Sequence, residues 1–206
     1  MSPLKKEEFK KLVKKKIISY WEILLRSEAL NLPSLTYFKP SMMSLCRPHP
    51  LFSSAGSSPS KVSMATVQAL MLSGRYRTEY LLRYWSSNSN GFCKLSPECS
   101  IKIEDVQHIV QICPALADTR ETLREFTNKY VSNLLPTLST LILKFCVPSH
   151  PNFCDFLLDC STIPEVVCLV QSLGGDVYTP LFDVTRTWIY VLHRERLKRL
   201  NRWKCS

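Results

Sequence analysis

Apolar residues near the start of the chain recur with the period of an α-helix. Those that share one face of this helix are Phe9, Leu12, Val13, Ile17, Trp21, Leu24 and Leu25. Residues 1–20 also hold seven lysines, and most of them fall on the opposite face. The pattern predicts a basic amphipathic helix over residues 1–30. Such a helix either packs on the protein or lies on an anionic membrane, and we favour packing because it is the commoner arrangement.

Further helical segments follow after residue 60. Residues 61–72 show a helical pattern that Gly74 ends, and Thr78 is a suitable N-cap for another helix after it. Helical spacing returns over residues 116–134, and residues 164–173 also read as a helix. No segment shows the strong alternation of a β-strand. The sequence therefore predicts a mainly α fold, an irregular helical assembly with strands at most in one loop.

The last segment is predicted to form a long helix. Thr179 is suited to be its N-cap and Pro180 to lie in its first turn, and the helix runs to about Trp203. The positions expected to face inward are Leu181, Val184, Trp188, Leu192 and Leu200.

Residues 31–59 interrupt the helical pattern. They contain Pro33, Pro40, Pro48 and Pro50, followed by a Ser-Ser-Ala-Gly-Ser-Ser-Pro run. This composition is typical of chain with weak structure of its own. We predict a flexible Pro/Ser-rich linker here.

Four potential metal ligands follow in the spacing Cys-x5-Cys-x8-His-x4-Cys, namely Cys93, Cys99, His108 and Cys113. Three thiolates and one imidazole form the closed tetrahedral shell that structural Zn²⁺ prefers, with no position open for a reacting water. The alternative is that these cysteines are ordinary buried apolar residues. We favour zinc, because the histidine lies on a predicted helix that the last cysteine and its proline end.

The spacing between His108 and Cys113 requires that helix to break. On a continuous α-helix the two side chains would lie about 140° apart. Pro114 disfavours the helical conformation at the residue before it, so Cys113 can leave the helix and turn its sulfur back toward His108. Pro114 then opens the next helix, whose dipole favours the thiolate form of Cys113.

The composition is that of a soluble globular protein, with 45% hydrophobic and 21% charged residues. No apolar run is long enough to span a membrane. Nine cysteines without a secretory signal indicate thiols and metal in a reducing compartment, so we expect an intracellular location in the nucleus or cytoplasm. Four parts are expected: a basic amphipathic helix (1–30), the linker (31–59), a helical zinc-binding module (60–145) and a C-terminal helical region with a basic end (146–206).

The net charge of +10 is concentrated at the two ends of the chain. Such clusters are typical of surfaces that bind phosphates, although most charge runs are solvated helix faces. Arginine pairs with phosphate and aromatic rings stack on unpaired bases, while a place in the core is an equally good interpretation of the aromatic residues. The candidate contacts to RNA or DNA are Arg75, Tyr76, Arg77, Arg83, Trp85, Arg194, Arg196, Lys198, Arg199 and Arg202.

Several of these motifs resemble a known family. Residues 71–85, which contain Gly-Arg-Tyr-Arg-Thr, and the Cys-Pro-Ala-Leu-x3-Arg run that begins at Cys113 resemble the region after the polymerase in non-LTR (LINE-type) retrotransposon reverse transcriptases. The resemblance extends from about residue 35 to residue 203. The chain departs from the family pattern at Tyr84, where a histidine is common, and in the wider spacing of its first two cysteines. The resemblance implies a CCHC zinc site in a segment that helps to hold template RNA or target DNA.

Catalysis is not expected. Polymerase chemistry needs clustered carboxylates to hold its metal ions, and the chain contains no Asp-Asp pair. We therefore expect a non-catalytic module that carries structural Zn²⁺ and binds RNA or single-stranded DNA, with no membrane partner and no small-molecule substrate. The alternative is a zinc-stabilised protein-interaction module, or a decayed fragment, without nucleic-acid binding.

Overall fold

The structure, a computed structural model, describes residues 6–31, 35, 37–39, 48–173 and 176–203, apart from the side chains of residues 30, 202 and 203. Its regular structure is helical, and the mainly α prediction is confirmed. The α-helices are α1 (Lys6–Leu30), α2 (Pro50–Ser53), α3 (Pro59–Leu72), α4 (Glu79–Leu82), α5 (Ala117–Val131), α6 (Pro136–Phe145), α7 (Phe153–Asp159), α8 (Pro164–Leu173) and α9 (Tyr178–Trp203). Short 3₁₀ turns are η3 (Pro97–Cys99), η5 (Pro114–Leu116) and η6 (Cys160–Thr162), and η4 (His108–Ile112) is a π-helical turn.

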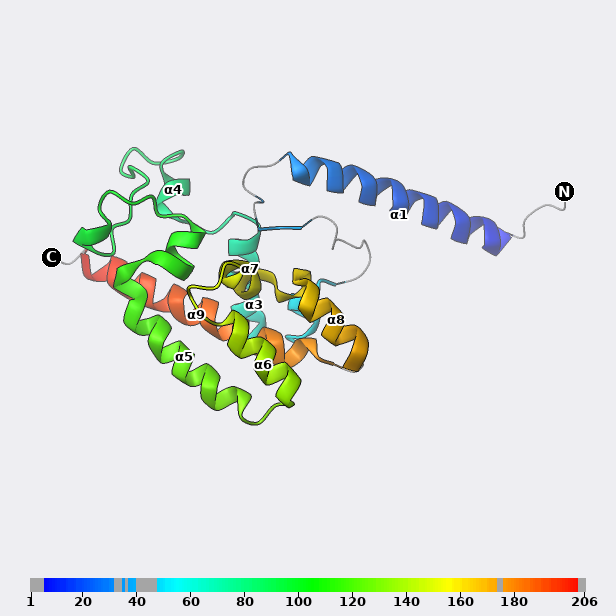
Figure 1. Ribbon diagram of the computed structural model, residues 1–206. Coiled ribbons are helices and arrows are strands. Elements are labelled where there is room, and N and C mark those ends of the chain that lie inside the picture. The colour runs from blue at the N-terminus through cyan, green and yellow to red at the C-terminus, as the bar shows by residue number, and fades with distance from the viewer. Residues whose placement is uncertain (1–5, 32–34, 36, 40–47, 174–175, 204–206) are drawn as a thin grey trace.

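Helix α9 is the central element of the core. It packs against α3, α5 and α7, so residues 60–145 and 146–206 share one hydrophobic core (Figure 1). Trp188 lies fully buried in its middle, where the indole Nε1–H donates to the Thr127 hydroxyl at 2.8 Å and the ring meets Phe153 edge to face. The predicted inward positions of this helix are buried, except that Leu200 is half-buried.

The ends of the helices follow from local capping. Pro59 opens α3, and Gly74 follows it with a φ of 66° that suits glycine. The Thr78 hydroxyl accepts from the Leu81 N–H and caps α4, as predicted. Helix α9 begins at Tyr178, one residue before the predicted N-cap, because Asp176 accepts from the backbone N–H of Thr179.

The second half of the predicted linker is more ordered than its composition indicates. Residues 50–53 form α2, and Leu51 and Ala55 are buried in the core. The fully buried Arg186 of α9 donates to the carbonyl oxygens of Leu51 and Ser54 and pairs with Asp183. Arg186, one of the basic residues near the C-terminus, thus holds this segment in place. A count of charges in the sequence does not show that this arginine is buried. Residues 32–34, 36 and 40–47 of the predicted linker lie outside the described residues.

Helix α1 does not pack as we expected. None of its described side chains is buried, and its apolar face is open, with Phe9, Ile17 and Trp21 about half exposed. In Figure 1 the helix extends away from the other helices. In the described segments, no helix combines the length and apolar character needed to cross a bilayer.

Candidate metal centre

A short loop between α4 and η4 carries the first two cysteines. An isolated antiparallel β-bridge between Phe92 and Ile103 closes this loop, and the Cys93 N–H donates to the Lys102 carbonyl at 2.8 Å. The chain enters it through Gly91, whose φ is 84°. This conformation favours glycine, and a Cβ there would also lie 3.0 Å from the Arg83 side chain, which would have to shift. Within the loop, Pro97 starts the 3₁₀ turn that presents Cys99.

A π-helical turn brings the other two ligands together. The Cys113 N–H donates to the His108 carbonyl at 2.7 Å, an i to i+5 bond that places residues five apart one above the other. Cys113 itself is extended, with a ψ of 117°, and Pro114 opens the next turn as predicted. The break at Cys113 is therefore confirmed. The π-helical turn before it also brings the side chains of His108 and Cys113 to the same side, whereas a regular α-helix would place them about 140° apart.

The four ligand atoms converge in the interior. Cys93, Cys99, His108 and Cys113 are all buried, and their sulfur and ring nitrogen atoms lie within 4.8 Å of one another. The Cys113 sulfur is 3.9 Å from the Cys93 sulfur and 3.8 Å from the Cys99 sulfur. A tetrahedral zinc ion with bonds of about 2.3 Å to sulfur would hold its sulfurs about 3.8 Å apart.

The unpartnered His108 nitrogen and the lowered pKa of the Cys113 thiol also fit a metal ion. His108 Nε2 is buried without a hydrogen-bond partner, and an imidazole nitrogen in that state is expensive unless it ligates something. The pKa of the Cys113 thiol is lowered, chiefly by its hydrogen bond with the Cys93 sulfur and then by His108, while burial raises the pKa of Cys99. This group of residues could hold a metal ion such as zinc.

Arg120 of α5 is a buried cation next to the sulfur cluster. Its guanidinium donates to the Cys113 carbonyl at 2.6 Å, and no carboxylate pairs with it within the described ranges. Burial lowers the pKa of Arg120, and the nearby Cys113 thiolate opposes this shift. Zn²⁺ with three thiolates has a net charge of −1, so Arg120 would offset the charge of a filled site.

We call residues 90–113 the metal loop. A buried ion pair connects this loop to α9. Glu104, which lies between Cys99 and His108 in the chain, is fully buried and accepts from Arg196 and from the Glu79 N–H. Arg196 is 3% exposed and lies over the Tyr76 ring, 5.4 Å from its centroid. The Tyr76 hydroxyl in turn lies 2.8 Å from His193 Nδ1.

Two residues predicted to bind nucleic acid, Tyr76 and Arg196, are thus internal. The Tyr76 hydroxyl and the Arg196 guanidinium make hydrogen bonds inside the protein, although Arg196 Nε has no partner. The sequence does contain a signal for this position of Arg196: it is four residues after Leu192 and eight after Trp188, on the buried stripe of α9. A partner such as Glu104 could not have been identified from spacing alone.

Four other residues predicted to bind nucleic acid lie in the chain next to α4. Arg75, Arg77, Arg83 and Trp85 are exposed. The Arg83 guanidinium carbon lies 4.1 Å from the Tyr80 ring centroid and 4.8 Å from that of Tyr84. Tyr84 and Trp85 are 61% and 66% exposed, which is unusual for aromatic rings of this size. We call Tyr80, Arg83, Tyr84 and Trp85 the aromatic platform; Tyr80 was not predicted from the sequence.

The predicted residues near the end of α9 differ in their surroundings. Arg194 and Lys198 are exposed, while Arg199 is half-buried. Lys198 and Arg199 both pair with Glu195, at 3.4 Å and 3.1 Å. The side chain of Arg202 lies outside the described residues.

Comparison of the chain with protein-family models, with curated proteins and with solved structures gave no match. The resemblance to the region after the polymerase in non-LTR retrotransposon reverse transcriptases therefore stays a prediction. The conclusions about function below depend on the geometry of the site and of the surfaces next to it.

Proposed function

We propose that Cys93, Cys99, His108 and Cys113 bind one structural Zn²⁺ ion. The proposal is supported by the burial of all four ligands, by sulfur separations that match a tetrahedral shell, and by the unpartnered His108 nitrogen. All four positions are taken by protein atoms, which leaves none for a substrate. The role of the metal is to hold the loop of residues 90–113 in place.

We further propose that the protein binds RNA or single-stranded DNA without catalysis, as the resemblance to retrotransposon segments implies. The observation that carries this proposal is the aromatic platform, in which Arg83 is held over two tyrosine rings beside an exposed Trp85. A guanidinium can pair with a phosphate while neighbouring rings stack on bases. Arg75 and Arg77, on the segment that precedes α4, are also exposed.

The salt dependence of binding tests this proposal. Affinity for a short single strand should fall with salt, with a log–log slope of about −0.7 for each phosphate that the protein neutralises. Replacing Arg75, Arg77 and Arg83 together by alanine should flatten the slope by about 0.7 for each phosphate that is no longer neutralised. A matched control replaces Arg124, Lys129 and Lys144, three exposed cations on α5 and α6, and should leave the slope unchanged. Equal slopes for both triple variants would contradict the assignment of this surface.

The second candidate function is a zinc-stabilised protein-interaction module. The observation that favours it is the open apolar face of α1, which has no partner side chains that bury it in the described part of the chain. This function requires no nucleic acid. A zinc-loaded protein that binds neither RNA nor DNA at moderate salt would favour the second candidate over the first.

A further inference from the structure

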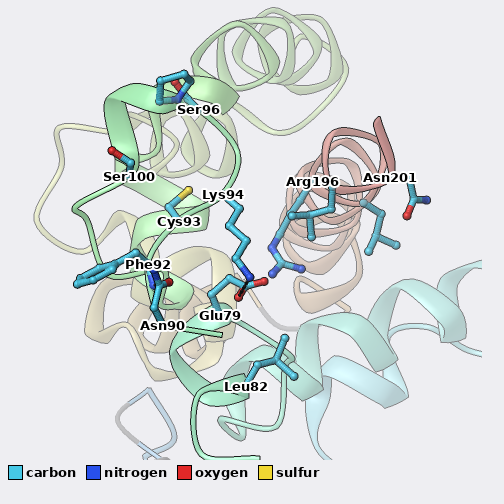
Figure 2. A pocket seen from close by; sticks show the side chains of 13 residues that line it. Glu79, Leu82, Asn90, Phe92, Cys93, Lys94, Ser96, Ser100, Arg196 and Asn201 are labelled. Carbon is cyan, nitrogen blue, oxygen red and sulfur yellow. Dashed lines mark hydrogen bonds and ion pairs between the residues drawn. The ribbon is translucent and has the colours of Figure 1, made fainter. Parts of the chain in front are cut away.

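A cavity of about 830 Å³ lies between the metal loop and the last turns of α9. Its volume is within the range of about 300–1,000 Å³ that is typical of ligand pockets. Figure 2 shows residues of the metal loop on one side, Arg196 and Asn201 of α9 on the other, and Glu79 and Leu82 of α4 between them. The metal ligand Cys93 is part of the wall, so the shape of the cavity depends on the metal loop.

The lining combines apolar walls with neutral hydrogen-bonding groups. Leu82, Leu197 and Leu200 provide apolar surface from two helices. The neutral polar groups are the amides of Asn90 and Asn201 and the hydroxyls of Ser96 and Ser100. An unpaired nucleobase is flat and apolar on its faces and carries donors and acceptors on its edges, which matches this combination.

The charges in the cavity are already balanced. Lys94 reaches across to Glu79 at 2.8 Å, as Figure 2 shows, and Arg196 is paired with Glu104. A phosphate would have to compete with these carboxylates, whereas a neutral base would not. Arg196 still has a buried Nε–H without a partner, and a buried donor of this kind is stabilised when it gains an acceptor.

Exposed cations adjoin the lining residues in the metal loop and along α9. The Arg83 side chain of the aromatic platform lies next to Gly91. The chain neighbours of Gly91, Asn90 and Phe92, both line the cavity. On the other side, Lys198 is exposed on the same helix as the lining residues Leu197 and Leu200. A strand bound at the aromatic platform therefore lies next to the lining of the cavity.

We infer that this cavity receives one unpaired base of the bound strand. The inference rests on the proposed nucleic-acid binding and makes it more specific, because a base paired in a duplex cannot enter. The protein should therefore prefer single strands to a duplex of the same sequence. A phosphate next to the inserted base lies toward Arg83.

Two strands with the same number of phosphates test this inference, one with all its bases and one made of abasic sites. The unmodified protein should bind the intact strand about tenfold more tightly, the order expected when a bound base is removed. Ser100→Trp places a large ring on the lining of the cavity and should reduce this difference, leaving the part that comes from stacking on the aromatic platform. Ile101→Trp is the matched control, since Ile101 is the next residue, is 79% exposed and does not line the cavity. Zinc content shows that both variants are folded.

The possible results separate the two proposals. Unchanged discrimination in zinc-loaded Ser100→Trp would overturn the base site and leave nucleic-acid binding standing. Equal affinity of the unmodified protein for both strands would do the same. If the unmodified protein binds neither strand, the proposed function fails and the base site fails with it.

Discussion

Arg120 shows how a single residue can indicate the charge of a metal site. A buried guanidinium without a carboxylate partner is costly unless a negative charge lies close to it. Around Arg120 the negative charge comes from the sulfur cluster, since its hydrogen bond goes to the Cys113 carbonyl and the thiolate of the same residue opposes the lowering of its pKa. The arginine and the filled metal site should therefore stabilise one another.

Replacing Arg120 by methionine should weaken zinc binding by about 10- to 100-fold, the range found when groups that support metal ligands are removed. The reason is that the net negative charge of the filled site loses its buried counter-charge. Competition with a chelator measures the change. Arg124→Met, at an exposed position on the same helix, is the control. An equal effect of both substitutions would show that Arg120 has no specific role.

At this scale the sequence predicted which four residues come together, but not their full surroundings. Cys93, Cys99, His108 and Cys113 are recognisable from residue type and spacing, and Pro114 indicates the break in the helix. The π-helical turn could not be predicted in the same way, because no residue type specifies an i to i+5 bond. Its effect is to bring His108 and Cys113 together.

At the scale of elements, α9 was predictable in length and in its buried face. In its basic end, the burial of Arg196 was not predicted, while Arg194 and Lys198 are exposed. Arg196 falls on the buried stripe, and the position of its partner Glu104 depends on how the metal loop packs. Contacts between residues far apart in the sequence are set by tertiary packing, which periodicity does not report.

Arg196→Met should destabilise the protein by about 3–5 kcal/mol, because it leaves the Glu104 carboxylate buried without its cation. The double variant Glu104→Leu/Arg196→Met should be destabilised much less than the sum of the two single changes, since no charge is then left unpaired. Urea unfolding measures both. Lys144→Met, which removes a surface pair with Glu165, should cost at most about 1 kcal/mol. Additive losses of stability in the double variant would rule out the buried pair as a unit.

At the scale of the whole molecule, α1 stands apart from the shared core. The sequence predicted its amphipathic face correctly, but periodicity shows that a face exists and does not show what covers it. The described part of the structure leaves that face open. The core is instead completed by α2, which lies in the predicted linker and is held by the buried Arg186 of α9.

Deleting residues 1–30 should therefore change the free energy of unfolding by no more than about 0.5 kcal/mol, as for other changes at the surface. Leu192→Ala, in the buried face of α9, should cost about 2–5 kcal/mol and serves as the positive control. Thermal or urea unfolding gives both values. A large loss of stability on deletion would mean that α1 packs on the other helices.

The zinc content of the purified, reduced protein tests the account most directly. Elemental analysis should give one zinc per chain, and His108→Ala should lose the metal together with part of its helical circular-dichroism signal, because binding and folding of the loop are coupled. His150→Ala is a suitable control, because this histidine lies outside the cluster, and it should keep its zinc. A reduced, folded protein without zinc, or a His108→Ala variant that binds zinc as tightly as the unmodified chain, would contradict the account.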